Sequence, residues 1–144
     1  MENFENAHLK RFNQLITQID AVYHDVALKL GISDSTLRIL YTVCWCGGEC
    51  QLSEITSGVS KQTINSALRK LEADNIVYLK AFEGRKKKVC LTDKGYDFVK
   101  DTVLRLIAIE NAIFDSWSDE ERTAYMELTK RYLSTFREKV VKEF

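Results

Sequence analysis

The sequence predicts a mainly α-helical fold that carries one β-hairpin, and three observations support this prediction. Apolar residues recur at helical spacing near both ends of the chain. Between them, residues 52–71 have the pattern of two short helices joined by a tight turn. Two runs rich in β-branched and aromatic residues, 76–82 and 88–91, then flank the turn Glu83-Gly84. A chain of 144 residues with this pattern forms one domain, or one half of a helical dimer.

The N-terminal third predicts two helices. The first has an apolar stripe with strict three-four spacing, formed by Leu9, Phe12, Ile16, Ile19, Tyr23, Val26 and Leu30. Gly31 ends this helix, at a position that usually needs a left-handed residue. Ser33 caps the second helix, and Ile32 and Leu37 form a hydrophobic staple across the cap. The second helix stops at Gly47-Gly48.

The remaining helices follow from caps and apolar spacing. A short helix covers residues 52–57 and is broken by Gly58. The next helix starts at Ser60, and its predicted buried side consists of Ile64, Ala67, Leu68 and Leu71. Thr92 caps a long helix that closes at Trp117. A capping box over residues 118–121 opens the last helix, which runs to near Val140.

Charge is segregated along the chain although the formal net charge is zero. Residues 60–94 contain nine Lys or Arg against four acidic residues, a local charge of +5, so the remainder carries −5. Such a distribution makes a local positive field that attracts polyanions, while the acidic remainder limits non-specific binding. The segment that contains the hairpin is therefore the predicted nucleic-acid contact.

The helix from Ser60 offers side chains that can read base edges. On a helical wheel Gln62, Ser66 and Arg69 lie opposite the buried side, with Asn65 and Thr63 on the flanks. Gln and Asn pair with adenine, and Arg pairs with guanine, in the major groove. The alternative is an ordinary solvated polar face. The predicted DNA contacts on this helix are Ser60, Lys61, Gln62, Thr63, Asn65, Ser66 and Arg69.

The hairpin tip supplies the second set of predicted DNA contacts: Arg85, Lys86, Lys87 and Lys88. Arg85 suits a narrow minor groove, where negative potential is concentrated, and the lysines suit phosphates. The alternative is a charged hairpin that keeps a strand edge from aggregating. Glu83 either holds Arg85 in position across the turn or belongs to ordinary turn chemistry.

Residues 37–99 resemble the winged helix-turn-helix of MarR-family transcriptional regulators. The segment Ser-Lys-Gln-Thr-Ile-Asn-Ser-Ala-Leu-Arg-Lys-Leu-Glu, residues 60–72, resembles the family's recognition helix. Arg85, shortly before Leu-Thr-Asp-Lys-Gly at 91–95, stands where the family's wing arginine falls. The usual wing Asp is replaced by Glu83, with Gly84 beside it.

This resemblance implies a mainly α fold: a winged helix-turn-helix core with a two-stranded β-wing, flanked by N- and C-terminal dimerisation helices. The DNA-binding region would cover residues 33–95, and the dimerisation region residues 1–32 and 96–144. It also implies a homodimer on an inverted-repeat operator of double-stranded DNA, often released by a small-molecule effector.

The sequence leaves open two arrangements of the terminal helices and two functions of the whole chain. The terminal helices carry more apolar surface than the small central unit can cover, which favours a two-fold dimer; in a monomer they would pack only on each other. The chain is most simply a sequence-specific transcriptional regulator. The competing hypothesis is a winged-helix module that docks its basic tip on an acidic protein.

An effector pocket would use aromatic residues near the junction of the two parts: Phe12, Tyr23 and Trp45, together with His24. At helical spacing such residues are more often core than ligand wall. No cofactor and no enzymatic activity are predicted, because the sequence has no phosphate-binding glycine motif, nucleophile elbow or metal-binding His cluster.

The four cysteines, Cys44, Cys46, Cys50 and Cys90, predict neither a metal site nor a redox switch. Cys46 and Cys50 barely meet the ligand spacing of zinc sites, and no cationic group next to them would activate a thiolate. Small buried hydrophobic residues are the favoured interpretation. No apolar run approaches the ~18 residues that span a bilayer, and the N-terminus lacks signal-peptide features. We therefore expect a cytoplasmic protein with reduced cysteines and no membrane partner.

Overall fold

The computed structural model describes residues 6–57 and 60–144. They fall into two compact units, Met1–Leu106 and Ile107–Phe144. Two features of the sequence analysis lie outside the described residues. They are the predicted helix break at Gly58 and residues 1–5 of the N-terminus. Within the described residues, no helix is both long enough and apolar enough to cross a membrane.

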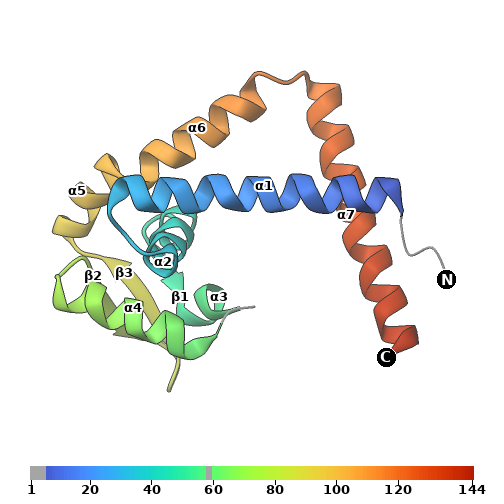
Figure 1. The fold of residues 1–144 in the computed structure, drawn as a ribbon. Coiled ribbons are helices and arrows are strands. Elements are labelled where there is room, and N and C mark those ends of the chain that lie inside the picture. Colours follow the sequence, from blue (N-terminus) through green and yellow to red (C-terminus); the bar gives the residue numbers. More distant parts are fainter. Residues whose placement is uncertain (1–5, 58–59) are drawn as a thin grey trace. The chain divides into compact units, whose positions relative to one another are not determined.

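The fold is mainly helical, with one small antiparallel sheet of strand order β1-β3-β2 (Figure 1). This confirms the predicted fold class. In chain order the elements are α1 (Ala7–Leu30), α2 (Asp34–Trp45), β1 (Glu49–Gln51), α3 (Leu52–Thr56), α4 (Lys61–Ala73), β2 (Val77–Ala81), β3 (Lys87–Leu91), α5 (Asp93–Asp101), α6 (Val103–Asp115) and α7 (Asp119–Glu143).

Helix α2 is the centre of the first unit. It contacts α1, α3, α4, β1 and β3, and its side chains Ile39, Leu40 and Val43 are fully buried. Each such side chain contributes about 1.5–3 kcal/mol when it is removed from water. Ile55 of α3 and Ile64 of α4 are also fully buried, so one core positions both helices of the helix-turn-helix.

The predicted helix caps are confirmed. Gly31 ends α1 in the left-handed conformation, with a φ of 70°. The side chain of Ser33 accepts a hydrogen bond from the Thr36 amide, and the side chain of Thr92 accepts one from the Gly95 amide. Ser118 and Glu121 form the complete capping box at the start of α7. These caps satisfy amides that would otherwise lack partners at the helix starts.

The sheet contains a third strand that the sequence analysis missed. Strand β1 pairs with β3, so that Cys50 lies opposite Val89 and Gln51 lies opposite Lys88. Gly47 and Gly48, with φ values of 86° and 102°, reverse the chain immediately before this strand. Left-handed backbone of this kind is accessible to glycine at no steric cost. The hairpin is therefore anchored in a three-stranded sheet rather than standing alone.

The single long helix predicted from Thr92 to Trp117 is wrong, because the structure divides it at Thr102 into α5 and α6. Thr102 has a φ of −125° and a ψ of −92°, which leaves the helical region. Its hydroxyl donates a hydrogen bond to the carbonyl of Phe98, four residues earlier, at 2.8 Å. Such back-bonding by threonine offers the helix an alternative partner and bends it.

The start of α5 is locked to the start of the hairpin at Gly95. A Cβ atom on Gly95 would lie 2.0 Å from the carbonyl oxygen of Ile76, so only glycine fits there. The Thr92 amide donates to the same carbonyl at 3.0 Å, and the Thr92 hydroxyl donates to the carbonyl of Asn75 at 2.6 Å. The Leu-Thr-Asp-Lys-Gly segment therefore fixes the base of β2.

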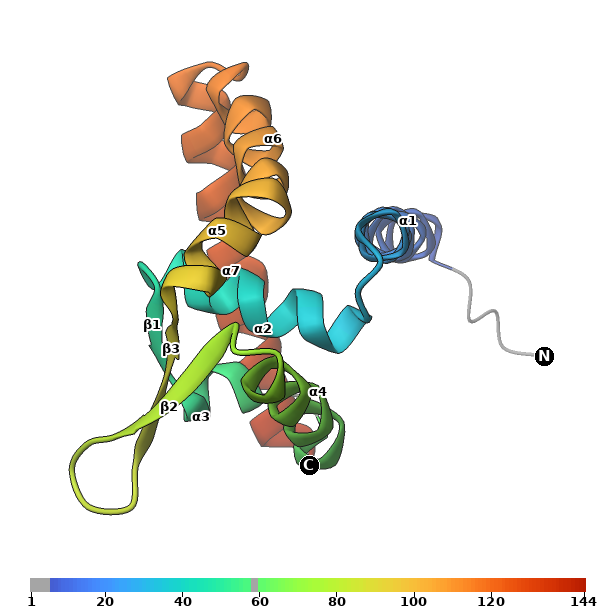
Figure 2. The same ribbon diagram turned by 90° about the vertical axis from the view of Figure 1, so that its left-hand side faces the viewer.

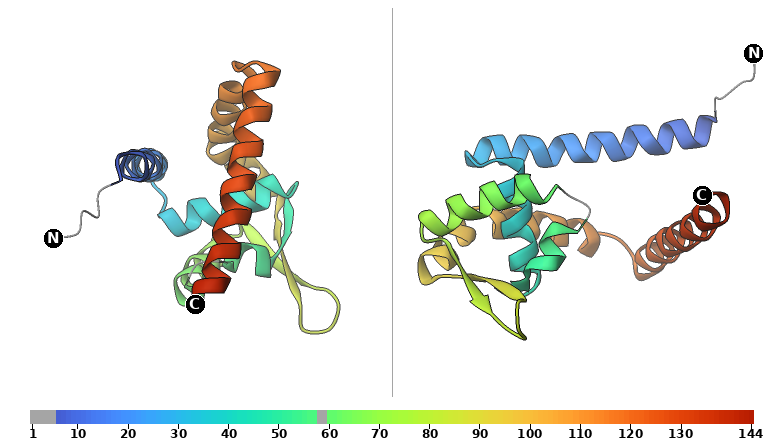
Figure 3. Two further views of the ribbon diagram at one scale, coloured as in Figure 1. Left: turned by 90° about the vertical axis from the view of Figure 1, so that its right-hand side faces the viewer. Right: turned by 90° about the horizontal axis from the view of Figure 1, so that it is seen from below.

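The second unit contains the end of α6 and the uninterrupted helix α7 (Figure 3). Phe114, Trp117 and Tyr125 form an aromatic cluster across the turn, with ring centroids 5.1–6.2 Å apart. Arg122 donates to the carbonyl groups of Phe114 and Trp117 at 2.7 and 2.6 Å. No residue of α7 is buried.

Candidate nucleic-acid interface

Helix α4 shows the two-sided character that the sequence predicts. Ile64, Leu68 and Leu71 are buried against the core, whereas Ala67 is only half-buried. All seven predicted contact residues of this segment are exposed: Ser60, Lys61, Gln62, Thr63, Asn65, Ser66 and Arg69. The burial on one side therefore turns a hydrogen-bonding face toward solvent.

The β2–β3 hairpin extends from the sheet and ends in the predicted cationic turn (Figure 2). Glu83 and Gly84 both have positive φ, at 44° and 73°, and the Phe82 amide bonds to the Lys86 carbonyl. Arg85, Lys86 and Lys87 are exposed. Glu83 pairs with Lys86 at 3.6 Å and not with Arg85, which favours the second of its two alternatives, ordinary turn chemistry.

Lys88 differs from the other predicted phosphate contacts. Its ammonium lies 2.9 Å from the Glu49 carboxylate and 5.0 Å from the centre of the Phe82 ring. The hydrogen bond and charge of Lys88 lower the pKa of Glu49, and Glu49 in turn raises the pKa of Lys88. Lys88 therefore joins β3 to β1 one residue from the turn end of β3, and part of its charge is already compensated.

The helix and the hairpin tip share one groove of about 590 Å³. Lys61 and Asn65 of α4 line it together with Arg85, Lys86 and Lys87 of the hairpin. The other lining residues are Gln51, Leu52, Ser53, Thr56 and Phe82. Sequence reasoning missed the polar members from β1 and α3, because nothing in the local pattern shows that α3 faces the wing.

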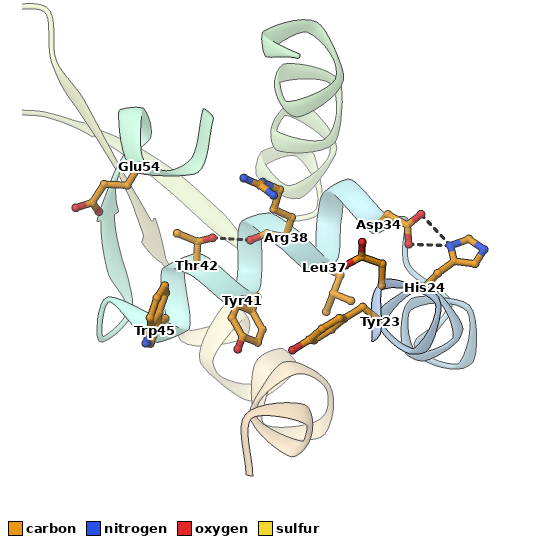
Figure 4. Close-up of a pocket in the computed structure, with 10 residues that line it drawn as sticks. Tyr23, His24, Asp34, Leu37, Arg38, Tyr41, Thr42, Trp45 and Glu54 are labelled. Carbon is orange, nitrogen blue, oxygen red and sulfur yellow. Dashed lines mark hydrogen bonds and ion pairs between the residues drawn. The ribbon is translucent and has the colours of Figure 1, made fainter. Parts of the chain in front are cut away.

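A second pocket, of about 530 Å³, lies among α1, α2 and α3 (Figure 4). It contains three of the four predicted effector residues, Tyr23, His24 and Trp45, but not Phe12. Its remaining lining residues are Asp20, Asp34, Leu37, Arg38, Tyr41, Thr42 and Glu54. The spacing of α1 indicated Tyr23 and His24, whereas the contributions of Arg38 and Tyr41 depend on how α1 crosses α2.

Polar contacts shape the rim of this second pocket. His24 Nδ1 lies 2.9 Å from the carboxylate of Asp34, so its partner comes from the start of α2 and not from the neighbouring Asp25. The Arg38 guanidinium donates to the carbonyl of Ser57 at 3.0 Å. Trp45 is 80% exposed, which makes it a wall of the pocket and not a core residue.

The cysteines differ in burial, and Cys44 is half-buried. Cys50 and Cys90 are buried, as predicted, whereas the prediction is wrong for Cys46, which is exposed. Burial raises the pKa of the Cys44 thiol to about 11. Burial and the hydrogen bond to Glu54 also raise the pKa of Cys50. The sulfur atoms of Cys46 and Cys50 lie 3.2 Å apart.

The fold is similar to that of solved MarR family proteins. A MarR family regulator from Neisseria meningitidis is 19% identical, with a TM-score of 0.76, over 96% of this chain and 99% of that chain. A MarR family transcriptional regulator from Streptomyces coelicolor, solved in complex with DNA, is 15% identical, with a TM-score of 0.63, over 94% and 91%. NadR in complex with 4-hydroxyphenylacetate is 13% identical, with a TM-score of 0.69, over 92% and 96%.

No protein-family model and no curated protein matches the sequence. The structural similarity nevertheless covers nearly the whole chain, and the chain has the winged helix-turn-helix fold of MarR family regulators. The first two of these similar proteins are described as regulators, not as enzymes.

Proposed function

We propose that this chain is a sequence-specific DNA-binding transcriptional regulator of the MarR family. The observation that carries the proposal is the groove shared by α4 and the hairpin tip, in which Lys61 and Asn65 lie with Arg85, Lys86 and Lys87. Base edges require hydrogen-bonding groups and phosphates require cations, and this face of the molecule supplies both. The similar regulator from Streptomyces coelicolor was solved with DNA.

The exposed face of α4 suits the major groove. A helix of 13 residues is about 20 Å long and fits a groove that is about 12 Å wide. Gln62 and Asn65 lie in its first two turns, where a recognition helix contacts base edges. The hairpin cations would then lie along the backbone or in the neighbouring minor groove.

We further propose that two copies form a dimer through the terminal helices. Leu9, Ile16 and Ile19 of α1 are 43–50% exposed. In α7, Leu128, Leu133 and Phe136 are 46–57% exposed, and no residue of this helix is buried. Apolar surface on this scale marks an interaction site. A two-fold dimer would present two recognition helices to an inverted repeat.

The pocket of α1, α2 and α3 is the proposed effector site. Tyr23, Tyr41 and Trp45 give it aromatic walls, and Arg38 gives it a cation. An aromatic small molecule fits this chemistry, because aromatic walls and a few polar groups are typical of ligand pockets. NadR, which has a similar fold, was solved with 4-hydroxyphenylacetate.

The test is selection of bound duplexes from a random pool, followed by affinity measurements over a series of salt concentrations. We expect a palindromic site. Replacing Gln62 by Ala should relax the preference at one base pair by about 1–3 kcal/mol. Lys100→Ala is the matched control, because it alters a surface residue of α5 outside the groove.

The alternative function, docking of the basic hairpin on an acidic protein, predicts a different result. Affinity for DNA would then be equal for selected and random duplexes, and Gln62→Ala would have no effect at any base pair. That outcome would remove the proposed reading role of α4.

A further inference from the structure

Three side chains, spaced four residues apart in the sequence, meet on the first unit, and one of them, Glu54, also lines the pocket proposed for an effector. Cys46 is the C-terminal cap residue of α2, Cys50 lies in β1, and Glu54 lies in α3. The Cys46 and Cys50 sulfurs are 3.2 Å apart. The same oxygen of Glu54, Oε2, lies 2.9 Å from the Cys50 sulfur and 3.5 Å from the Cys46 sulfur.

These distances leave room for one metal ion. Three atoms at these separations all lie about 1.9 Å from a common centre, so an ion about 1 Å out of their plane reaches each at the ~2.0–2.3 Å of zinc–oxygen and zinc–sulfur bonds. We propose that Cys46, Cys50 and Glu54 bind a single Zn²⁺, with water as the fourth ligand. On binding, the two thiols release their protons to solvent and the thiolates donate to the ion.

The donor set selects this type of ion. Two sulfurs and one carboxylate suit a borderline-soft cation, whereas Mg²⁺ and Ca²⁺ require oxygen ligands. Cys46 and Glu54 are exposed, which gives the ion access from solvent, and Cys50 is buried and holds the inner side. Without an ion both thiols donate hydrogen bonds to the same Glu54 oxygen, and a metal ion would replace the two thiol protons between these three atoms.

The ion would join three elements that the chain connects through a glycine turn. Gly47 and Gly48 bring Cys46 and Cys50 together across the turn, and α3 starts directly after β1. A ligand that binds the folded chain and not the unfolded one stabilises the fold by mass action. Zinc at a hundredfold excess over its Kd should therefore raise the Tm by roughly 5–10 °C.

The experiment uses the full chain, reduced with a phosphine, stripped of metal with a chelator and kept free of DNA. Co²⁺ reports thiolate ligation through its charge-transfer absorption, and Zn²⁺ is titrated against a chromophoric chelator. Cys46→Ser and Glu54→Gln change exposed ligands and should leave the fold intact by circular dichroism. Cys44→Ser is the matched control, since Cys44 precedes the turn but lies outside the cluster.

We expect one equivalent of Zn²⁺, thiolate–cobalt absorption, and affinity lowered about 100-fold or more in Cys46→Ser and Glu54→Gln but unchanged in Cys44→Ser. Absence of thiolate–cobalt absorption would overturn the proposal, as would equal loss in the Cys44→Ser control. The proposal would also be overturned if the chain bound no metal and air instead oxidised Cys46 and Cys50 to a disulfide, with loss of two hydrogen atoms. Because no DNA is present, failure here is distinguishable from failure of the proposed regulator function.

Discussion

Helices α4 and α7 both have exposed faces, but their apolar sides are buried to different extents. The apolar side of α4 is buried within its own unit through Ile64, Leu68 and Leu71, which leaves a polar face in water. Helix α7 buries no residue, and its exposed side chains include Leu128 and Leu133. A polar face on a fully supported helix is available for a ligand, whereas an apolar face without support calls for a second protein surface.

Under the proposed function, the two regions would have different partners. The α4 face matches the hydrogen-bonding and charged groups of a duplex, and the α7 face matches another apolar helix. In that proposal one chain would supply one recognition helix, and association through the terminal helices would supply the second. Changes in each region should have separable effects, and the four predictions below run from the largest expected effect to the smallest.

The largest effect is expected from a charge placed on the apolar face of α7. Leu133→Asp should raise the dimer dissociation constant about 100-fold or more, since burying an unpaired carboxylate costs about 3 kcal/mol or more. Sedimentation velocity measures this directly. Lys130→Asp places the same group at an exposed polar position of the same helix and should leave the dimer intact. Identical sedimentation of the two variants would break the comparison between α4 and α7.

The next effect concerns the support of the hairpin. Gly95→Ala should destabilise the fold by about 1–3 kcal/mol, because its Cβ would lie 2.0 Å from the Ile76 carbonyl oxygen. Gly47→Ala meets no atom within 4 Å and should cost only about 1 kcal/mol for its left-handed backbone. Urea denaturation compares the two variants. A Gly95→Ala variant as stable as Gly47→Ala would contradict this account of the hairpin base.

Two adjacent lysines sharpen the description of the wing. Lys87 is exposed and lines the shared groove, whereas Lys88 is paired with Glu49. Lys87→Ala should therefore lower the slope of log affinity against log salt by about one unit, and Lys88→Ala should lower it by less. Affinities for one selected duplex over a salt series give both slopes. Equal salt slopes for the two variants would mean that the ion pair with Glu49 does not keep Lys88 from contacting a phosphate.

The smallest effect is the pH dependence of that ion pair. Lys88 lowers the pKa of Glu49 below its ordinary 4.5, so the pair stabilises the fold above pH 4.5 and the contribution is lost as pH falls through the lowered value. Glu49 raises the pKa of Lys88 above its ordinary 10.5. The contribution of the pair to stability is therefore complete below pH 10.5 and is lost as the pH rises through the raised value. Glu49→Gln should be less stable than the parent chain in urea at neutral pH, and the difference should disappear as the pH falls below the lowered pKa of Glu49.

Much of the fold could be predicted because its signals are local. Ser33, Thr92 and Ser118 all cap the helices that they were expected to cap, and the apolar spacing of α4 placed its polar face correctly. In each case the partner atom lies three residues away, or the pattern repeats with the helical period. Such contacts do not depend on how distant segments meet.

The missed break at Thr102 has a local cause, its hydrogen bond to Phe98, whereas the other failures depend on contacts between distant segments. Strand β1 has only three residues, Glu-Cys-Gln, and forms because β3 offers it an edge. The partner of Lys88 is Glu49, 39 residues earlier, and not a residue of the turn. The cysteine cluster gains its third member, Glu54, from the start of α3, which spacing between cysteines does not indicate. The side chains of α3 that line the groove were missed for the same reason.

The three-residue strand β1 couples two otherwise separate places. Its central residue, Cys50, belongs to the sulfur cluster and is the ladder partner of Val89, while its last residue, Gln51, is the partner of Lys88. Neighbouring antiparallel strands share backbone hydrogen bonds, so a shift of one moves the other. A displacement of the Cys50 sulfur would therefore shift β1 and, through the paired strand β3, the neighbouring wing residue Lys88.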